Sequence, residues 1–194
     1  MSRISRVTVF LGSSTGRHPE YAKAARAFGG AVAARGAGLV YGGGRVGLMG
    51  IVADAAMAAG GEVVGVIPQH LLAAEAADDD VTSLEIVPDM HARKLRMAEL
   101  GDAFVALPGG AGTLEELFEA WTWLQLGIHR KPVALLDVAG FWTPLIAAID
   151  HLTAEGFVQD GFRRTLIVSD DIEDLLAALE QWQPPAPKGG APRP

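Results

Sequence analysis

The sequence of 194 residues contains no cysteine. The chain can therefore form no disulfide, no cysteine-ligated zinc site and no thiol nucleophile. Aromatic residues make up only 7%, and 16 Lys and Arg residues are outnumbered by 23 Asp and Glu residues. The net charge of −7 argues against non-specific binding to nucleic acid, which needs a basic surface.

Long hydrophobic runs are also missing near the beginning of the sequence. The first apolar stretch, Val7–Leu11, is too short for the core of a signal peptide or for a membrane span. We therefore expect a cytoplasmic protein that does not bind membranes. The five histidines lack the spacing of a metal site, such as two on one helical turn with a third ligand, so we expect neither a metal nor a cofactor.

Short apolar segments alternate with amphipathic helical patterns along most of the chain. Strands are predicted near residues 7–11, 39–41, 62–67, 84–87, 103–107, 133–136 and 166–168, and the main helices near 19–35, 113–126, 141–155 and 171–181. This alternation predicts an α/β fold, a parallel sheet with helices on both faces. Residues 1–183 are expected to form a single domain, and the Pro/Gly-rich residues 184–194 a disordered tail.

Three glycine-rich turns each follow a predicted strand, at Gly12–Gly16, Gly42–Gly50 and Gly109–Gly112. Ligands of open parallel sheets bind beyond the carboxyl ends of the strands, so we expect the three turns to converge on one crevice. The second turn is no dinucleotide fingerprint, because it follows the second strand and no acidic residue is placed to hold a ribose. No Lys-Ser or Lys-Thr follows any of the turns, which also rules out a P-loop. Gly12, Ser13, Gly43 and Gly44 are candidate substrate-binding residues of the first two turns.

The third turn, at residues 107–116, has the sequence Leu-Pro-Gly-Gly-Ala-Gly-Thr-Leu-Glu-Glu. Its glycines allow a ligand to approach the backbone, and the start of the following helix offers N–H donors to a phosphate. Glu115 and Glu116 are expected in the first helical turn. The alternative is purely structural: Thr113 as N-cap and Glu116 three residues later would form a capping box.

A second group of charged residues lies in Met-His-Ala-Arg-Lys, at positions 90–94. Its helix carries the densest basic cluster of the chain, at residues 93–96. A guanidinium pairs with phosphate or carboxylate oxygens in a fork geometry, which favours a ligand role for Arg93. The alternative is an amphipathic helix whose basic face is solvated.

Together these motifs resemble the LOG family, the cytokinin-activating phosphoribohydrolases often labelled lysine decarboxylase-like. The family signature Pro-Gly-Gly-x-Gly-Thr-x-x-Glu is matched by Pro108–Glu116, and Gly-Gly-Gly-x-x-Gly-Leu-Met-Gly by Gly42–Gly50. Met90–Lys94 matches the Met-His-x-Arg-Lys element. Phe10–Ser14 and Trp121–His129 are also similar to family segments.

The resemblance extends from about Val7 to Gln181 and implies a modified Rossmann fold and a homodimer. It also implies hydrolysis of N6-modified adenosine 5′-monophosphates to the free base and ribose 5-phosphate. By position, Arg93 and Glu116 are the implied catalytic pair. The implied substrate-binding residues are Glu75, Lys94, Gly109, Gly110, Ala111, Gly112, Thr113, Leu114, Glu115 and Thr122. Around Glu75 the sequence Ala-Ala-Glu-Ala differs from the family's Pro-Arg-Glu-Ile.

The chemistry of the residues is compatible with this reaction. Cleavage of an N-glycosidic bond passes through a state with positive charge near C1′, which a carboxylate can stabilise while it takes a proton from water. We expect Glu116 to fill this role, with Glu115 as the alternative. Two further functions stay open: a broader nucleosidase that acts on AMP or other purine monophosphates, and a carrier that binds a nucleotide or phosphorylated cofactor without chemistry. Lysine decarboxylation is disfavoured, because it needs pyridoxal phosphate on a lysine with an acidic partner.

Overall fold

The computed structural model describes residues 4–72, 77–78 and 80–185. Glu75 and most of the predicted tail, residues 186–194, lie outside this described part. The strands are β1 Arg6–Phe10, β2 Gly38–Tyr41, β3 Val63–Pro68, β4 Ser83–Val87, β5 Ala103–Ala106, β6 Val133–Leu136 and β7 Leu166–Ser169. The helices are α1 Pro19–Ala34, α2 Gly47–Ala58, α3 Met90–Leu100, α4 Ala111–Leu126, α5 Thr143–Ala154, α6 Asp160–Arg163 and α7 Ile172–Gln181.

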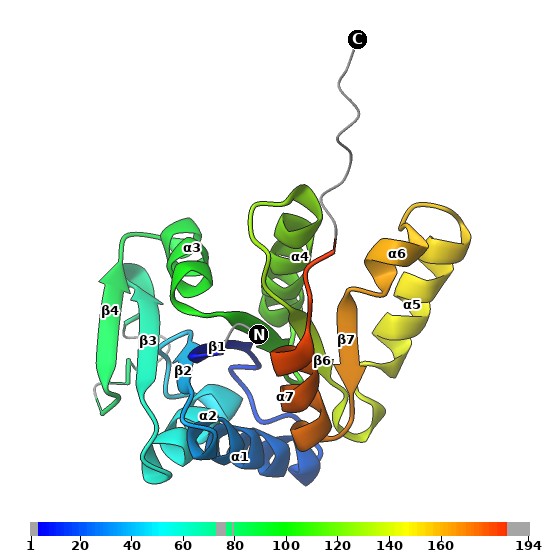
Figure 1. Cartoon of the computed structure of the whole chain (residues 1–194). Coiled ribbons are helices and arrows are strands. Elements are labelled where there is room, and N and C mark those ends of the chain that lie inside the picture. The colour runs from blue at the N-terminus through cyan, green and yellow to red at the C-terminus, as the bar shows by residue number, and fades with distance from the viewer. Residues whose placement is uncertain (1–3, 73–76, 79, 186–194) are drawn as a thin grey trace.

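The seven strands form one sheet in the order β4-β3-β2-β1-β5-β6-β7. Every neighbouring pair is parallel. Helices α1, α2 and α7 pack on one face of the sheet, and α3, α4 and α5 on the other (Figure 1). The predicted α/β fold with helices on both faces is therefore confirmed.

Burial explains why the central strands read as uninterrupted apolar runs. All residues of β2, β3, β5 and β6 are buried, as expected for strands covered by helices on both sides. The edge strands β4 and β7 are more open, and Ile86 and Val168 are exposed there.

Strand β1 marks the point where the chain reverses its direction of travel across the sheet. The strands after it first extend to one side, through β2, β3 and β4, and then return to its other side with β5. Phe10 and Ala106 pair in register at the ends of β1 and β5. Just beyond them, the Gly12 N–H donates to the Pro108 carbonyl at 3.1 Å. Such a switch point is where open α/β sheets bind ligands.

Some local structure differs from the sequence-based expectation. Helix α4 begins at Ala111, two residues before the predicted start at Thr113. Short 3₁₀ segments at Gln69–Leu71 and Val138–Gly140 and the four-residue helix α6 were not predicted. Segments of three or four residues are too short to show a helical period.

Candidate active site

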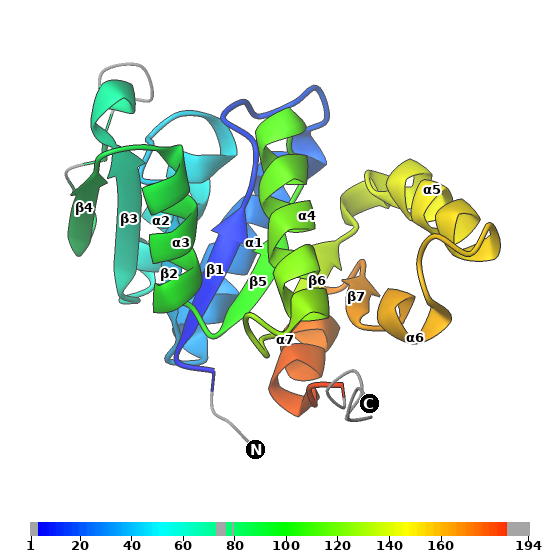
Figure 2. The same cartoon turned by 90° about the horizontal axis from the view of Figure 1, so that it is seen from above.

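The three glycine-rich turns meet at a cavity of about 250 Å³ beyond the carboxyl ends of the central strands. Figure 2 shows the turn after β1 beside the beginning of α4. The lining consists of Val9, Leu11, Gly12, Ser13, Gly42, Met49, Leu71, Met90, Arg93, Met97, Gly110, Ala111, Gly112, Thr113, Glu115 and Glu116. The predicted convergence of the three turns on one crevice is therefore confirmed.

The glycines of the third turn serve two different purposes. A Cβ atom on Gly109 would overlap with the Thr113 hydroxyl and come within 2.9 Å of the Gly12 nitrogen, so Gly109 permits close packing of two turns. A Cβ on Gly110 or Gly112 would meet no protein atom within 4 Å. Their surroundings are open and face the cavity, which leaves their backbone accessible to a ligand.

The capping-box hypothesis for the third turn is wrong. The N-cap of α4 is Gly110, which has no side chain to cap the helix, and Thr113 is the third helical residue, buried against Gly109. The expectation that both glutamates lie in the first helical turn is also wrong, because the helix begins earlier than predicted. No side-chain cap satisfies the first N–H groups of α4, which leaves them suited to an anion.

Arg93 is held inside the protein by backbone carbonyls. Its side chain is 4% exposed. Nε donates to the Val66 carbonyl in β3 at 3.1 Å, and Nη2 donates to the Gly42 carbonyl at 2.6 Å. Asp89 caps α3 by accepting from the Ala92 N–H at 2.8 Å, which fixes the turn of helix that carries Arg93. The guanidinium is thus pre-oriented at the wall of the cavity.

Lys94 points away from the cavity and joins α3 to α4. Its Nζ lies 2.5 Å from Glu115 Oε1 and 3.0 Å from Glu119 Oε2. Burial lowers the pKa of Lys94, but the hydrogen bonds to the two carboxylates outweigh burial and raise its pKa above the ordinary value. Among the described residues that line the cavity there is no lysine.

The two glutamates of the signature both line the cavity but differ in their surroundings. The Glu115 side chain is 55% exposed and tied to Lys94. Glu116 is half-buried. The lower exposure of Glu116 is compatible with the expectation that it is the reacting carboxylate, and the choice between the two glutamates stays a prediction.

Several predicted binding residues lie outside the cavity lining. Leu114 packs against the core on the α4 side of the sheet, and Thr122 is exposed on α4. Gly43 and Gly44 are buried in the second turn, where Gly43 has a φ of +75° that only glycine adopts without strain. Gly109 and Lys94 are also absent from the cavity lining, and Glu75 lies outside the described residues. The binding roles of all the predicted site residues stay predictions.

Sequence reasoning missed the apolar wall of the cavity, formed by Met49, Met90, Met97 and Leu71. Met49 and Met90 belong to the two motifs already noted, so the motifs carried a signal that attention to charged residues overlooked. Leu71 follows β3 in a 3₁₀ turn, and no sequence pattern pointed to it.

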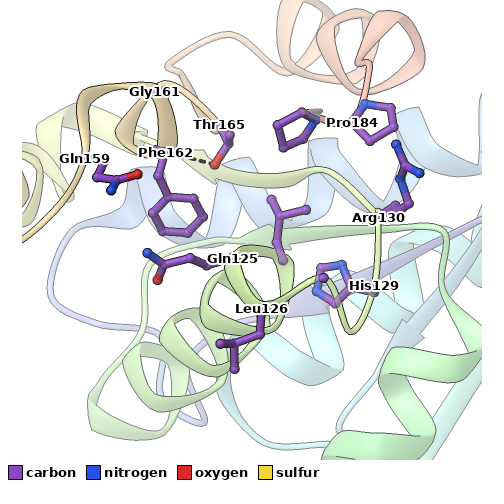
Figure 3. Close-up of a pocket in the computed structure, with 12 residues that line it drawn as sticks. Gln125, Leu126, His129, Arg130, Gln159, Gly161, Phe162, Thr165 and Pro184 are labelled. Atoms are coloured by element: carbon purple, nitrogen blue, oxygen red, sulfur yellow. Dashed lines mark hydrogen bonds between the residues drawn. The ribbon is translucent and has the colours of Figure 1, made fainter. Parts of the chain in front are cut away.

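A larger cavity, of about 530 Å³, lies near the C-terminal end of α4 and beside α6 (Figure 3). Two of its polar side chains are engaged within the protein: His129 Nε2 contacts the Ala120 carbonyl at 2.8 Å, and Thr165 Oγ1 donates to the Phe162 carbonyl at 2.6 Å. Burial lowers the pKa of His129. The described lining of this cavity contains no carboxylate, and helix α6, which begins at it, is only four residues long. The smaller cavity is therefore the candidate active site.

No described helix combines the length and the apolar character that a membrane crossing requires.

Comparison with known proteins assigns the chain to a family. The family model described as "possible lysine decarboxylase" matches residues 49–179. The cytokinin riboside 5′-monophosphate phosphoribohydrolase LOG7 of Arabidopsis thaliana is 47% identical over 94% of this chain and 84% of its own length. The cytokinin riboside 5′-monophosphate phosphoribohydrolase of Rhodococcoides fascians is 51% identical over 89% of this chain and 88% of its own length.

Among solved structures, the molybdenum cofactor carrier protein of Chlamydomonas reinhardtii superposes with a TM-score of 0.69 at 24% identity. The match covers 92% of this chain and 98% of that one, and at this identity it shows a common fold alone. The sequence relatives and the family model are decisive: the chain belongs to the LOG family, whose model carries the description "possible lysine decarboxylase".

Proposed function

We propose that the protein hydrolyses the N-glycosidic bond of N6-modified adenosine 5′-monophosphates, giving the free base and ribose 5-phosphate. The observation that carries this proposal is that Arg93 and Glu116 line one cavity with the uncapped start of α4. Two relatives that are 47% and 51% identical are named as phosphoribohydrolases of cytokinin riboside 5′-monophosphate.

In this proposal each side of the cavity has its own task. The 5′-phosphate binds at the start of α4, where Gly110 and Gly112 leave the backbone open and the helix dipole favours negative charge. Glu116 stabilises the positive charge that develops near C1′ and takes a proton from the attacking water. The hydroxyl of that water joins C1′, and the departing base receives a proton. The Arg93 guanidinium offsets negative charge on the substrate.

The apolar wall supports a preference for a modified base. Three methionines and Leu71 face the cavity, and the flexible, polarisable side chain of methionine adapts to irregular apolar groups. A hydrocarbon substituent on N6 would gain from this surface, at roughly 0.8 kcal/mol for each buried methylene.

The test is a comparison of substrates. The protein is incubated with isopentenyl-AMP, with AMP and with the two ribosides, and free base is separated by chromatography. We expect base release from isopentenyl-AMP and none from the ribosides, since these lack the phosphate that α4 holds. Equal rates with AMP would favour the broader purine nucleotide nucleosidase, and no release from any monophosphate would contradict hydrolysis.

A carrier and a decarboxylase are both less consistent with the site. A carrier without chemistry has no need of a carboxylate and a guanidinium in one cavity. A decarboxylase needs a lysine for pyridoxal phosphate, yet Lys94 is tied to Glu115 and Glu119 and Lys131 bonds the carbonyls of Ala98 and Gly101. An absorbance band near ~400 nm in the purified protein would revive the decarboxylase.

We further propose that the protein is a homodimer. Phe118, Thr122 and Leu126 follow one another at intervals of four residues along α4 and form an exposed stripe. Leu126 is 67% and the neighbouring Ile128 63% exposed, and contiguous apolar surface of this kind marks an interface. Thr122 would then reach a nucleotide only in the cavity of a second copy. Sedimentation that shows a monomer at micromolar concentration would contradict the dimer.

The proposed substrate and the acidic surface also lead us to propose a cytoplasmic location and no nucleic-acid partner. Nucleoside monophosphates are intermediates of cytoplasmic metabolism, and the net charge of −7 repels phosphate backbones. Fractionation of cells that express a tagged protein tests the location, and a gel-shift assay with DNA and RNA at low salt tests the absence of binding.

A further inference from the structure

Asp78 is buried beside the turn that follows β2, although it contributes no atom to the cavity. It is 1% exposed, and it is the only acidic side chain among the described residues that is buried. Its Oδ2 accepts a hydrogen bond from the Tyr41 hydroxyl at 3.0 Å, and its Oδ1 lies 3.7 Å from Arg45 Nη1. A carboxylate inside a protein is destabilising unless hydrogen bonds and opposite charge compensate it, and Oδ1 of Asp78 has no hydrogen bond within the described part of the chain. The burial of the Asp78 carboxylate therefore needs a structural or functional explanation.

The backbone of the same residue contacts the same turn. The Asp78 N–H donates to the Gly43 carbonyl at 3.0 Å, and Ala77 pairs with Gly44 in an antiparallel bridge. Asp78 thus braces Tyr41 with its side chain and Gly43 with its backbone. These are the two residues on either side of Gly42, whose carbonyl accepts the hydrogen bond from Arg93 Nη2.

Tyr41 provides a fixed end for this brace. Its ring is fully buried in the core beneath α1 and α2. Burial, followed by the charge of Asp78 and the hydrogen bond to it, raises the pKa of Tyr41 above its ordinary value. The hydroxyl therefore stays protonated at neutral pH and remains a donor to Asp78.

We propose that Asp78 is a positioning residue for Arg93, because it holds the turn at Gly42 through Tyr41 and Gly43 and so fixes the carbonyl that orients the guanidinium. The catalytic consequence rests on the proposed hydrolase function, whereas the positioning of Arg93 does not. Displacement of a reacting group by about 1 Å can lower the rate by two orders of magnitude. Loss of Asp78, which acts on Arg93 through the turn at Gly42, should therefore have a measurable effect on the rate.

The experiment compares Asp78→Ala and Tyr41→Phe, which remove the two partners of the side-chain bond, with the control Asp80→Asn. Asp80 is exposed and also pairs with Arg45, so the control changes local charge without touching Tyr41. Two quantities are measured: kcat/KM for isopentenyl-AMP, and the exchange rate with water, by NMR, of the Arg93 Nη2 protons, which bond the Gly42 carbonyl. The Arg93 signal is assigned by its loss in Arg93→Lys.

We expect Asp78→Ala and Tyr41→Phe each to lower kcat/KM about tenfold and to speed exchange of the Arg93 Nη2 protons by about the same factor. Their effects should not add in the double variant. Asp78→Asn keeps an acceptor for the Tyr41 hydroxyl, so its kcat/KM and its Arg93 exchange rate should lie closer to those of the wild type than to those of Asp78→Ala. Asp80→Asn should change neither quantity by more than about twofold.

Slow Arg93 exchange that persists in folded Asp78→Ala and Tyr41→Phe would overturn the proposal. Variants that lose all protected signals together would also overturn it, since Asp78 would then stabilise the whole fold. If the wild-type protein cleaves no nucleotide, the proposed function fails, but the exchange measurement still decides whether Asp78 positions Arg93.

Discussion

Arg93 and Gly42 are in contact although 51 positions separate them in the sequence, and each explains the other. The Gly42 carbonyl accepts from Arg93 Nη2 at 2.6 Å. A Cβ atom on residue 42 would overlap with the guanidinium. The glycine is therefore needed because an arginine side chain occupies the space that any other residue would fill.

Gly42→Ala should displace the Arg93 guanidinium and lower kcat/KM about a hundredfold. Steady-state kinetics with isopentenyl-AMP measures the effect. Gly30→Ala is the matched control, because a Cβ there meets nothing within 4 Å and α1 is remote from the cavity. If Gly42→Ala stays folded and keeps wild-type activity, the fixed position of Arg93 is not required.

Glu116→Gln should lower kcat about a thousandfold with little change in KM, because the amide can neither take a proton nor offset the charge near C1′. Glu115→Gln should have a much smaller effect. Its carboxylate is 55% exposed and pairs with Lys94, and the glutamine amide oxygen can still accept a hydrogen bond from that lysine. The reverse ranking of the two variants in a kcat assay would assign the reaction to Glu115.

The sequence was sufficient to predict the sheet, its helices and the convergence of the turns, because these depend on apolar period and on glycine. It was misleading at Thr113, where the spacing of a capping box coincides with the family signature. Only the position of Gly110 as N-cap shows that Thr113 packs inward. The contact of Arg93 with Gly42 was also out of reach, since no local pattern relates residues so far apart.

The pairing of Lys94 illustrates the same limit. A lysine next to Arg93 on the sequence suggested a common ligand. On a helix, however, adjacent side chains point about 100° apart. Lys94 accordingly contacts Glu115 and Glu119 of α4, whereas Arg93 donates to the carbonyls of Val66 and Gly42. The direction of a side chain relative to a neighbouring helix depends on how the two helices pack. Local patterns in a single sequence do not predict that packing.

Gly112→Ala should separate stability from function. Residue 112 lies in the first turn of α4 with open space where a Cβ would project. Alanine is a better helix former than glycine by about 0.5–1 kcal/mol, so thermal unfolding should shift to a higher temperature. The new methyl group would project into the proposed phosphate site, and KM should rise about tenfold. A stabilised variant with unchanged KM would show that the phosphate does not bind at this part of the turn.

The last prediction concerns pH and His129. Burial, together with the charge of Lys131, lowers the pKa of His129 in the folded state below its ordinary value, although the bond to the Ala120 carbonyl opposes the shift. Between the two pKa values the unfolded chain binds a proton that the folded protein does not. The free energy of unfolding should therefore fall as the pH drops below about 6.5.

Urea unfolding at pH 8, 7, 6 and 5 measures this free energy on both sides of the ordinary histidine pKa of about 6.5. His129→Gln should reduce the loss at low pH, whereas His151→Gln, which removes an exposed imidazole, is the matched control. An equal loss in wild type and His129→Gln would show that other groups cause the acid sensitivity.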